Sequence, residues 1–168
     1  SARRLRERAF LLDGERLTLR SMARTAHAAP KYQGAPPLAE WLQDRIDDSI
    51  ADLINEDRES ERSNEPIEGG AELRFTFLTE TIGVAPTIAR RVCVVFNDLP
   101  DDRRQAFWAM VIEGKSLNRY VAEGHGPPEK AHDDLKEAFL ALSLLETPRL
   151  PEDDFEGDGE DDPEEVPR

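Results

Sequence analysis

The sequence predicts an all-α protein built from two small helical lobes, and three observations support this prediction. Apolar residues recur at three- and four-residue intervals over long stretches, as they do along helices that bury one face. A stretch rich in glycine, proline and glutamate interrupts the chain after residue 63. The 168 residues, 38% hydrophobic and 35% charged, suffice for small cores rather than for the single deep core of a typical enzyme. We therefore expect a first lobe over 1–62, a linker over 63–70, a second lobe over 71–146 and a disordered acidic tail over 147–168.

In the first lobe, the strongest prediction is a helix from Pro37 to about Glu61. Pro36 and Pro37 mark its start, because proline is well tolerated in a first helical turn. Acidic residues occupy most of the remaining surface of this helix. Its apolar stripe, in which Trp41 is expected to be a core residue, consists of Leu38, Trp41, Leu42, Ile46, Ile50, Leu53 and Ile54.

The second lobe is expected to begin near Ala71, where residues 73–78 fit either a helix or a short strand and we favour a helix. Thr87 is expected to cap the next helix, in which Ile88, Val92, Val95 and Phe96 point inward. A turn at residues 98–102 then leads into a helix that ends at Gly114 and has Trp108 in the core.

The last two expected helices form a short–long pair. Ser116 is predicted to cap a short helix over residues 117–123, and a glycine- and proline-rich turn follows it. The final helix should run from Pro128 to Leu145. One face of this helix carries Ala131, Leu135, Ala138, Phe139 and Leu142.

Charge is distributed unevenly about the net value of −14. Residues 1–33 carry a net charge of +5, whereas residues 146–168 carry −9. Proteins that grip nucleic acid over their whole surface normally have the opposite sign, so any contact with DNA must be local. The basic N-terminal segment is either an exposed helix end or a patch that folds back on the acidic tail. The tail is either a solubilising appendage or a mimic of DNA charge.

No pattern typical of catalysis or of metal and cofactor binding is present. The single cysteine, Cys93, lies in an apolar run and excludes an internal disulfide and any multi-cysteine metal site. His125 and His132 lack the neighbouring ligands of a zinc site, and no phosphate-binding glycine loop or nucleophile motif occurs. We expect no enzymatic activity, no cofactor and no small-molecule substrate.

Apolar stretches are too short to span a membrane, and the arginine-rich N-terminus lacks the apolar core of a secretory signal. These features favour a cytoplasmic location without membrane contact.

The second lobe resembles a known family in one continuous register. The matching residues are Leu99-Pro100, Arg103–Phe107, Val111–Leu117, Val121–Glu123 and Gly126. This register resembles the promoter-recognition domain of bacterial RNA polymerase sigma factors of the extracytoplasmic-function (ECF) type. There a Leu-Pro turn precedes a helix that ends in Glu-Gly-x-Ser, followed by an Ile/Val-Ala-Glu helix, a glycine turn and a recognition helix. The resemblance implies that residues 71–146 form a helix-turn-helix of sigma region 4 type.

The first lobe is similar to the second conserved sigma region. The similarity rests on the turn Tyr32-Gln33-Gly34, the run Pro37–Leu42 with its Trp-Leu pair, and the Asp-Leu step within Ile50–Ile54. Two lobes joined by a linker match the two-domain plan of the family. In that family, acidic and amide residues that grip the polymerase would align with Arg16, Leu19 and Arg20. The resemblance therefore implies a partner-binding surface with Arg16, Arg20, Trp41 and Arg45.

Charge at the DNA-facing positions departs from the family pattern. The expected recognition helix carries Glu129, Asp133, Asp134 and Glu137 beside two lysines. Carboxylates within a Debye length of about 8 Å would repel the phosphates. The residues that could still contact DNA are Lys115, Arg119, Lys130 and Lys136.

We therefore expect a sigma-factor-like protein that acts through RNA polymerase or a sigma-binding regulator and reads promoter DNA weakly. Its partners would engage the apolar seams at residues 38–54 and 131–142. Two alternatives remain open: a functional ECF sigma factor that binds promoter DNA, and a helical interaction module unrelated to transcription.

Overall fold

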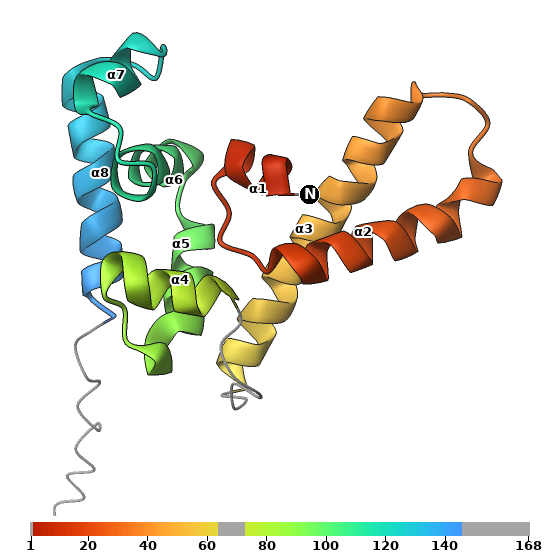
Figure 1. Cartoon of the computed structure of the whole chain (residues 1–168), viewed down its shortest axis with the longest axis horizontal. Coiled ribbons are helices and arrows are strands. Elements are labelled where there is room, and N and C mark those ends of the chain that lie inside the picture. The colour runs from red at the N-terminus through yellow and green to blue at the C-terminus, as the bar shows by residue number, and fades with distance from the viewer. Residues whose placement is uncertain (1, 64–72, 146–168) are drawn as a thin grey trace, which may run out of the picture.

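The computed structural model describes residues 2–63 and 73–145, and every regular element in these ranges is helical (Figure 1). The order of elements begins with α1 (Ala2–Arg8), α2 (Gly14–Ala28), a 3₁₀ turn (Ala29–Lys31) and α3 (Leu38–Arg62). It continues with α4 (Leu73–Ile82), a 3₁₀ turn (Pro86–Ile88), α5 (Ala89–Asp98), α6 (Asp101–Phe107), a π-helical turn (Trp108–Ile112), α7 (Leu117–Ala122) and α8 (Pro128–Ser143). The predicted all-α class is therefore confirmed for the described residues.

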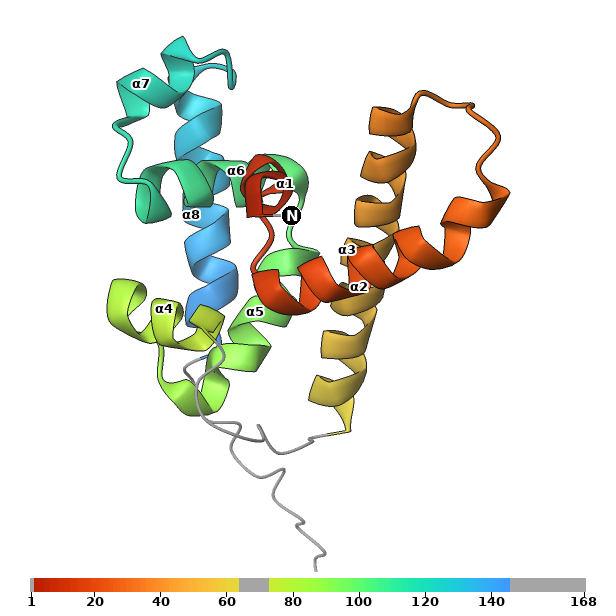
Figure 2. The same ribbon diagram turned by 45° about the vertical axis from the view of Figure 1, so that its right-hand side comes forward.

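Helices α2 and α3 form an antiparallel pair in the N-terminal half (Figures 1 and 2). Asp13 caps α2, because its side chain accepts hydrogen bonds from the backbone amides of Glu15 and Arg16. Leu17 on α2 and Ile50 and Leu53 on α3 are buried together with two leucines from the segment that precedes α2. The predicted helix over residues 37–61 is confirmed as α3.

Only the second half of the predicted α3 stripe lies in a core. Leu38 and Leu42 are 55% and 36% exposed, because α2 packs against the part of α3 that follows them. The prediction that Trp41 is a core residue is wrong. Its ring is half-buried and packs at a tilt on Tyr32, with ring centroids 4.9 Å apart, outside the buried clusters.

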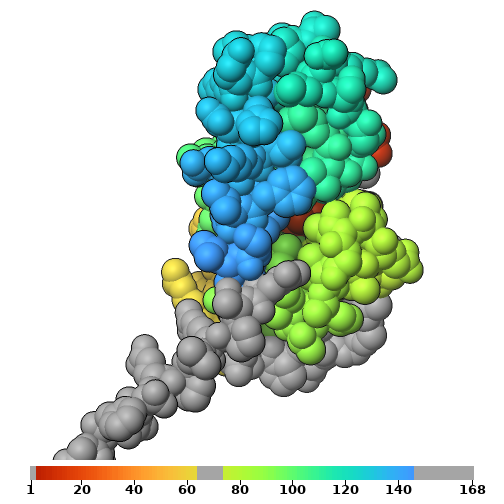
Figure 3. Space-filling view, turned by 90° about the vertical axis from the view of Figure 1, so that its left-hand side faces the viewer, coloured from red at the N-terminus to blue at the C-terminus, as the bar shows by residue number. Residues whose placement is uncertain are grey.

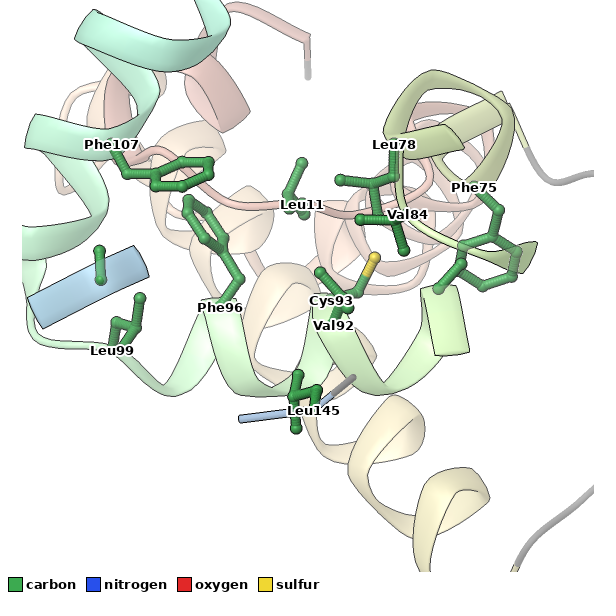
Figure 4. Packing of buried hydrophobic residues seen from close by; sticks show 12 residues of the cluster. Leu11, Phe75, Leu78, Val84, Val92, Cys93, Phe96, Leu99, Phe107 and Leu145 are labelled. Atoms are coloured by element: carbon green, nitrogen blue, oxygen red, sulfur yellow. The ribbon is translucent and has the colours of Figure 1, made fainter. Parts of the chain in front are cut away.

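The larger core lies in the C-terminal half, where α4, α5, α6 and α8 meet (Figure 4). Phe96 and Phe107 pack edge to face at its centre, with ring centroids 5.5 Å apart. Cys93 is fully buried in the same cluster, as the sequence predicts. Residues 73–82 form a helix rather than a strand, which confirms the preferred alternative.

One local prediction in this half is wrong. Thr87 does not cap α5, because Pro86 starts a 3₁₀ turn that includes Thr87, and the helix begins only at Ala89. Phe139 is 47% exposed although it contacts Phe107, because it lies at the margin of the buried face of α8. Gly114 and Ser116 have their predicted roles: the former adopts a positive φ after the π-helical turn, and the latter caps α7.

A short strap over residues 9–13 joins the two halves. It starts at Ala9, which is fully buried and has a positive φ of 51°, and it ends at the cap of α2. Leu11 points into the C-terminal core, whereas Leu12 belongs to the N-terminal cluster. The buried side chain of Asn97 accepts a hydrogen bond from the Leu11 amide at 2.8 Å and donates one to the Leu11 carbonyl at 3.0 Å.

Side chains on the helices make further contacts across the two halves. Arg58 of α3 pairs with Asp98 of α5, and Asp57 of α3 forms a buried pair with Arg74 of α4. The expected linker over 63–70, apart from Ser63 at the end of α3, and the expected tail over 147–168 lie outside the described residues. Among the helices that the structure describes, none combines the length and apolarity needed to cross a membrane.

Candidate functional site

The C-terminal candidate site is a corner formed by α7, a tight turn and α8. α7 lies across the N-terminal end of α8 (Figures 1 and 2). The hydroxyl of Ser116 accepts a hydrogen bond from the Arg119 amide, which fixes the start of α7. Gly124 and Gly126 in the turn have φ values of 94° and 95°, a region that favours glycine.

Small side chains allow the helices of this corner to approach closely. Ala106, Ala109 and Ala131 are buried around the ring of Tyr120, which anchors α7 on α6 and α8. The imidazole of His125, in the turn that follows α7, stacks on the ring of Tyr120. The two ring centroids are 4.3 Å apart and the ring planes lie within 5° of each other. The corner is therefore a packed unit with its own small core.

Lys115 and Arg119, two of the candidate DNA-binding residues, are paired within the corner. The Lys115 ammonium lies 2.8 Å from the Glu123 carboxylate and 3.3 Å from that of Glu113. The Arg119 guanidinium lies 3.3 Å from Glu123 as well. The hydrogen bonds that these two cations donate hold the pKa of Glu123 below its ordinary value. The hydrogen bonds that Lys115 donates to Glu123 and Glu113 raise the pKa of Lys115.

Lys130, the third candidate, is held between two carboxylates. Its ammonium lies 2.5 Å from Asp102 at the start of α6 and 2.7 Å from Asp134 one turn along α8. These two hydrogen bonds raise the pKa of Lys130 and lower that of Asp102. The ammonium of Lys130 therefore links α8 to α6 through ion pairs, and its partners are carboxylates of the same chain.

Lys136 differs from the other three candidates, because it is exposed and forms no ion pair within 2–63 and 73–145. The same outer surface of α8 carries exposed Glu129, Asp133 and Glu137, and the last of these lies 3.4 Å from Arg103. Figure 3 looks onto the side of the molecule where α8 and α7 lie at the surface. Within the described residues, Glu129 and Asp133 on this surface of α8 pair with no lysine or arginine, whereas Lys136 is its one unpaired cation.

The N-terminal candidate residues Arg16 and Arg20 belong to a ladder of ion pairs between α2 and α3. Arg16 pairs with Glu56, Arg20 with Glu56 and Asp52, and Arg24 with Asp52 and Asp48. The arginines are four residues apart on α2, and the acids are four apart on α3, so each set lines one face of its helix. The sequence did not reveal this ladder, because the pairing requires knowledge of which helix faces α2.

Trp41 and Arg45, the remaining partner-binding candidates, lie in the first turns of α3. The Arg45 guanidinium stands 5.9 Å from the centroid of the Trp41 ring. The structure thus brings Trp41 and Arg45 together near the start of α3, and Arg16 and Arg20 together through their shared partner Glu56 toward its end.

An apolar groove that the sequence did not predict runs between α2 and α3 beside these residues. Its volume is about 410 Å³, and Met22 and Leu42, both exposed, lie along it with Ile46 at its base. The amphipathic pattern of α2 could have revealed Met22, but the arginines in this segment obscure it.

No protein-family model, curated protein or solved structure matches this chain.

Proposed function

We propose that this chain is a sigma-factor-like protein that acts in transcription initiation mainly through contacts with RNA polymerase or a sigma-binding regulator. Promoter DNA is read weakly in this proposal. The observation that carries it is the internal pairing of Lys115, Arg119 and Lys130 by the acids of the same corner. The short helix, glycine turn and long helix support the resemblance to sigma region 4, and the charges argue against a DNA-binding surface of the usual kind.

Binding of DNA at this corner would be unfavourable for two reasons. A phosphate would have to replace Glu123 as the partner of Lys115, or Asp102 and Asp134 as the partners of Lys130. Those acids would then lie unpaired within a Debye length of about 8 Å of the DNA. Lys136 alone supplies too little positive charge to compensate.

The apolar groove between α2 and α3 is the surface that best fits a protein partner. Exposed Met22 and Leu42 line it, and Leu42 directly follows the half-buried Trp41 on α3. Aromatic residues are enriched in the centres of interfaces. Arg45 beside Trp41 adds a charge that can contact a carboxylate at the rim.

Size-exclusion chromatography with core RNA polymerase tests the protein-contact part of this proposal. We expect the chain to coelute with the polymerase, and we expect Met22→Glu to abolish coelution by placing a charge in the groove. Asn118→Glu, on the exposed surface of α7, is the matched control and should leave coelution unchanged. If both variants coelute with the polymerase equally well, the groove is not the surface that contacts it.

An electrophoretic shift assay at low salt tests the DNA part. We expect no sequence-selective shift with promoter fragments. Tight and selective binding would favour the alternative of a functional ECF sigma factor, for which Lys136, unpaired among the described residues, is the supporting observation. Affinity purification from the native cell without any polymerase subunit would instead favour an interaction module unrelated to transcription.

A further inference from the structure

A polar cavity lies on the side of the corner that faces the N-terminal helix. Its volume is about 440 Å³, and residues from the end of α1, the start of α6 and the turn before α8 line it. The side chains that matter are those of Glu7, Asp101, Asp102, Tyr120, His125 and Lys130. Three separate parts of the chain thus converge on a cavity that contains the Lys130–Asp102 pair but has no role of its own in the proposed function.

Tyr120 is the almost fully buried side chain that lines this cavity. The residue is only 3% exposed, yet its hydroxyl forms no hydrogen bond with any group in the described part of the chain. The oxygen itself is not fully buried, so solvent in the cavity can reach it. A ligand that excludes this solvent must replace the hydrogen bond, because a buried hydroxyl without a partner costs about 1–3 kcal/mol. Because Tyr120 lines the cavity, a ligand in it can complete this hydrogen bond.

Negative charge dominates the surroundings of that hydroxyl. Burial first, and then the charges of Asp134 and Asp102, raise the pKa of Tyr120, so the phenol is neutral at pH 7. Lys130 is the only cation among the six side chains, and it contacts one oxygen of Asp102 and one of Asp134. Asp101 likewise uses one oxygen to accept a hydrogen bond from Arg104 at 2.8 Å.

The second oxygens of Asp101 and Asp102 accept no hydrogen bond within the residues that the structure describes. Both side chains are largely exposed, at 63% and 67%, so an incoming group can reach these oxygens. The cavity therefore offers two carboxylate acceptors, one phenol oxygen and the exposed ring of His125, whose plane is fixed by its stacking on Tyr120.

We propose that this cavity binds the guanidinium group of an arginine in a basic segment of a partner protein. A guanidinium has five donors in a planar fork, so it can reach two carboxylates and a phenol oxygen at once. Its flat face also stacks on an aromatic ring, as the imidazole of His125 allows. The ammonium of lysine is a compact point charge that satisfies fewer of these acceptors together. This site stands on its own geometry and does not require the partner to be RNA polymerase.

Titration with two short peptides tests the proposal by NMR. The probes are the blocked peptides (Gly-Arg)₄ and (Gly-Lys)₄ in 150 mM salt, which suppresses weak attraction between opposite charges. We expect the arginine peptide to shift the backbone amide signals of Gly124, His125 and Gly126. We expect the lysine peptide to bind at least about fivefold more weakly, because it forms fewer charge-assisted hydrogen bonds.

Two variants separate the site from general attraction to an acidic protein. Tyr120→Phe removes only the hydroxyl and should weaken arginine-peptide binding by about fivefold, the effect of one lost hydrogen bond. Asp102→Asn removes one carboxylate and should weaken binding by about tenfold. Asp44→Asn, an exposed acid on α3, is the control with the same charge change and should alter binding by less than about twofold.

The proposal is overturned if Tyr120→Phe and Asp102→Asn both bind the arginine peptide like the unmodified chain, or if the lysine peptide binds equally well. It is also overturned if the shifted signals lie on α3 rather than in the turn before α8. Far-ultraviolet circular dichroism and thermal unfolding of each variant establish that a loss of binding reflects the site rather than the fold.

Discussion

Among individual residues, Asp57 and Arg74 form the most deeply buried ion pair in the described part of the molecule. Their side chains are only 7% and 5% exposed, and the Nη2 atom of Arg74 lies 3.1 Å from the Asp57 carboxylate. The pair connects the last turns of α3 to the first turn of α4. Removal of one member leaves the other charged and desolvated, which is far more costly than the loss of an exposed pair.

We expect Asp57→Ala to lower the free energy of unfolding by about 3–5 kcal/mol. Asp98→Ala breaks the exposed pair with Arg58 and should lower it by no more than about 1 kcal/mol. Urea denaturation followed by circular dichroism measures both values. Similar losses for the two variants would show that burial does not distinguish these pairs.

A second effect of a single residue is that Lys130 controls the ionisation of Asp102. The ammonium lowers the pKa of this carboxyl, so its contribution to stability is fully present above about pH 4 and is lost as the pH falls through the lowered value. We expect Lys130→Gln to raise the pKa of Asp102 toward its ordinary value. Carboxyl NMR titration measures the change, and Lys136→Gln should leave the pKa of Asp102 unaltered, since Lys136 contacts neither Asp102 nor Asp134 in the described residues.

At the scale of elements, the ladder between α2 and α3 consists of exposed or half-exposed ion pairs, so its effect on stability is small for each pair. We expect a double-mutant cycle with Arg24→Gln and Asp52→Asn to give a coupling of about 0.2–1 kcal/mol. The coupling should decrease in 1 M salt, where the Debye length falls to about 3 Å. Thermal unfolding of the four proteins at both salt concentrations provides the measurement, and a coupling that salt leaves unchanged would contradict an electrostatic origin.

Local sequence signals predicted those elements whose ends are set by nearby residues. The apolar spacing of α3, the glycine after the π-helical turn and the Ser116 cap all depend on residues within one or two turns. Thr87 failed as a cap because the proline before it favoured a 3₁₀ turn, a competition that periodicity does not reveal. Trp41 failed as a core residue because the extent of α2 decides which turns of α3 are covered.

The candidate site was predictable in its residues but not in their pairing. The sequence indicated Lys115, Arg119 and Lys130 as cations on the corner, and it showed the excess of acids around them. Which acid each cation meets depends on packing, because Asp102 reaches Lys130 only when α6 lies beside α8. The cavity that Tyr120 lines likewise forms only when three segments of the chain meet.

For the whole molecule, the strap and Asn97 couple the two halves. Leu11 is buried in the C-terminal core, while the adjacent Leu12 is buried in the N-terminal cluster. The halves should therefore unfold together as one cooperative unit, although each has its own core. Trp41 and Trp108 report on the N-terminal and C-terminal halves respectively.

We expect the variants Trp41→Phe and Trp108→Phe, each with one remaining tryptophan, to give coincident urea transitions by fluorescence. Leu11→Ala in both backgrounds should destabilise the chain by about 2–5 kcal/mol and separate the two transitions, because it removes the side chain that the strap inserts into the other half. Leu140→Ala, on the exposed face of α8, is the control and should keep the transitions together. Separate transitions before any change to Leu11 would refute the coupling.

The strap also limits where residues can be inserted into the chain or deleted from it. The left-handed backbone of Ala9 fixes the start of the strap, and the helix cap at Asp13 fixes its end. The side-chain amide of Asn97, which lies 86 positions after Leu11 in the sequence, fixes its middle. One inserted or deleted residue would exchange the directions of Leu11 and Leu12 and send each toward the wrong core. Homologues with this architecture are therefore expected to keep the strap free of insertions, and an asparagine far downstream should accompany it.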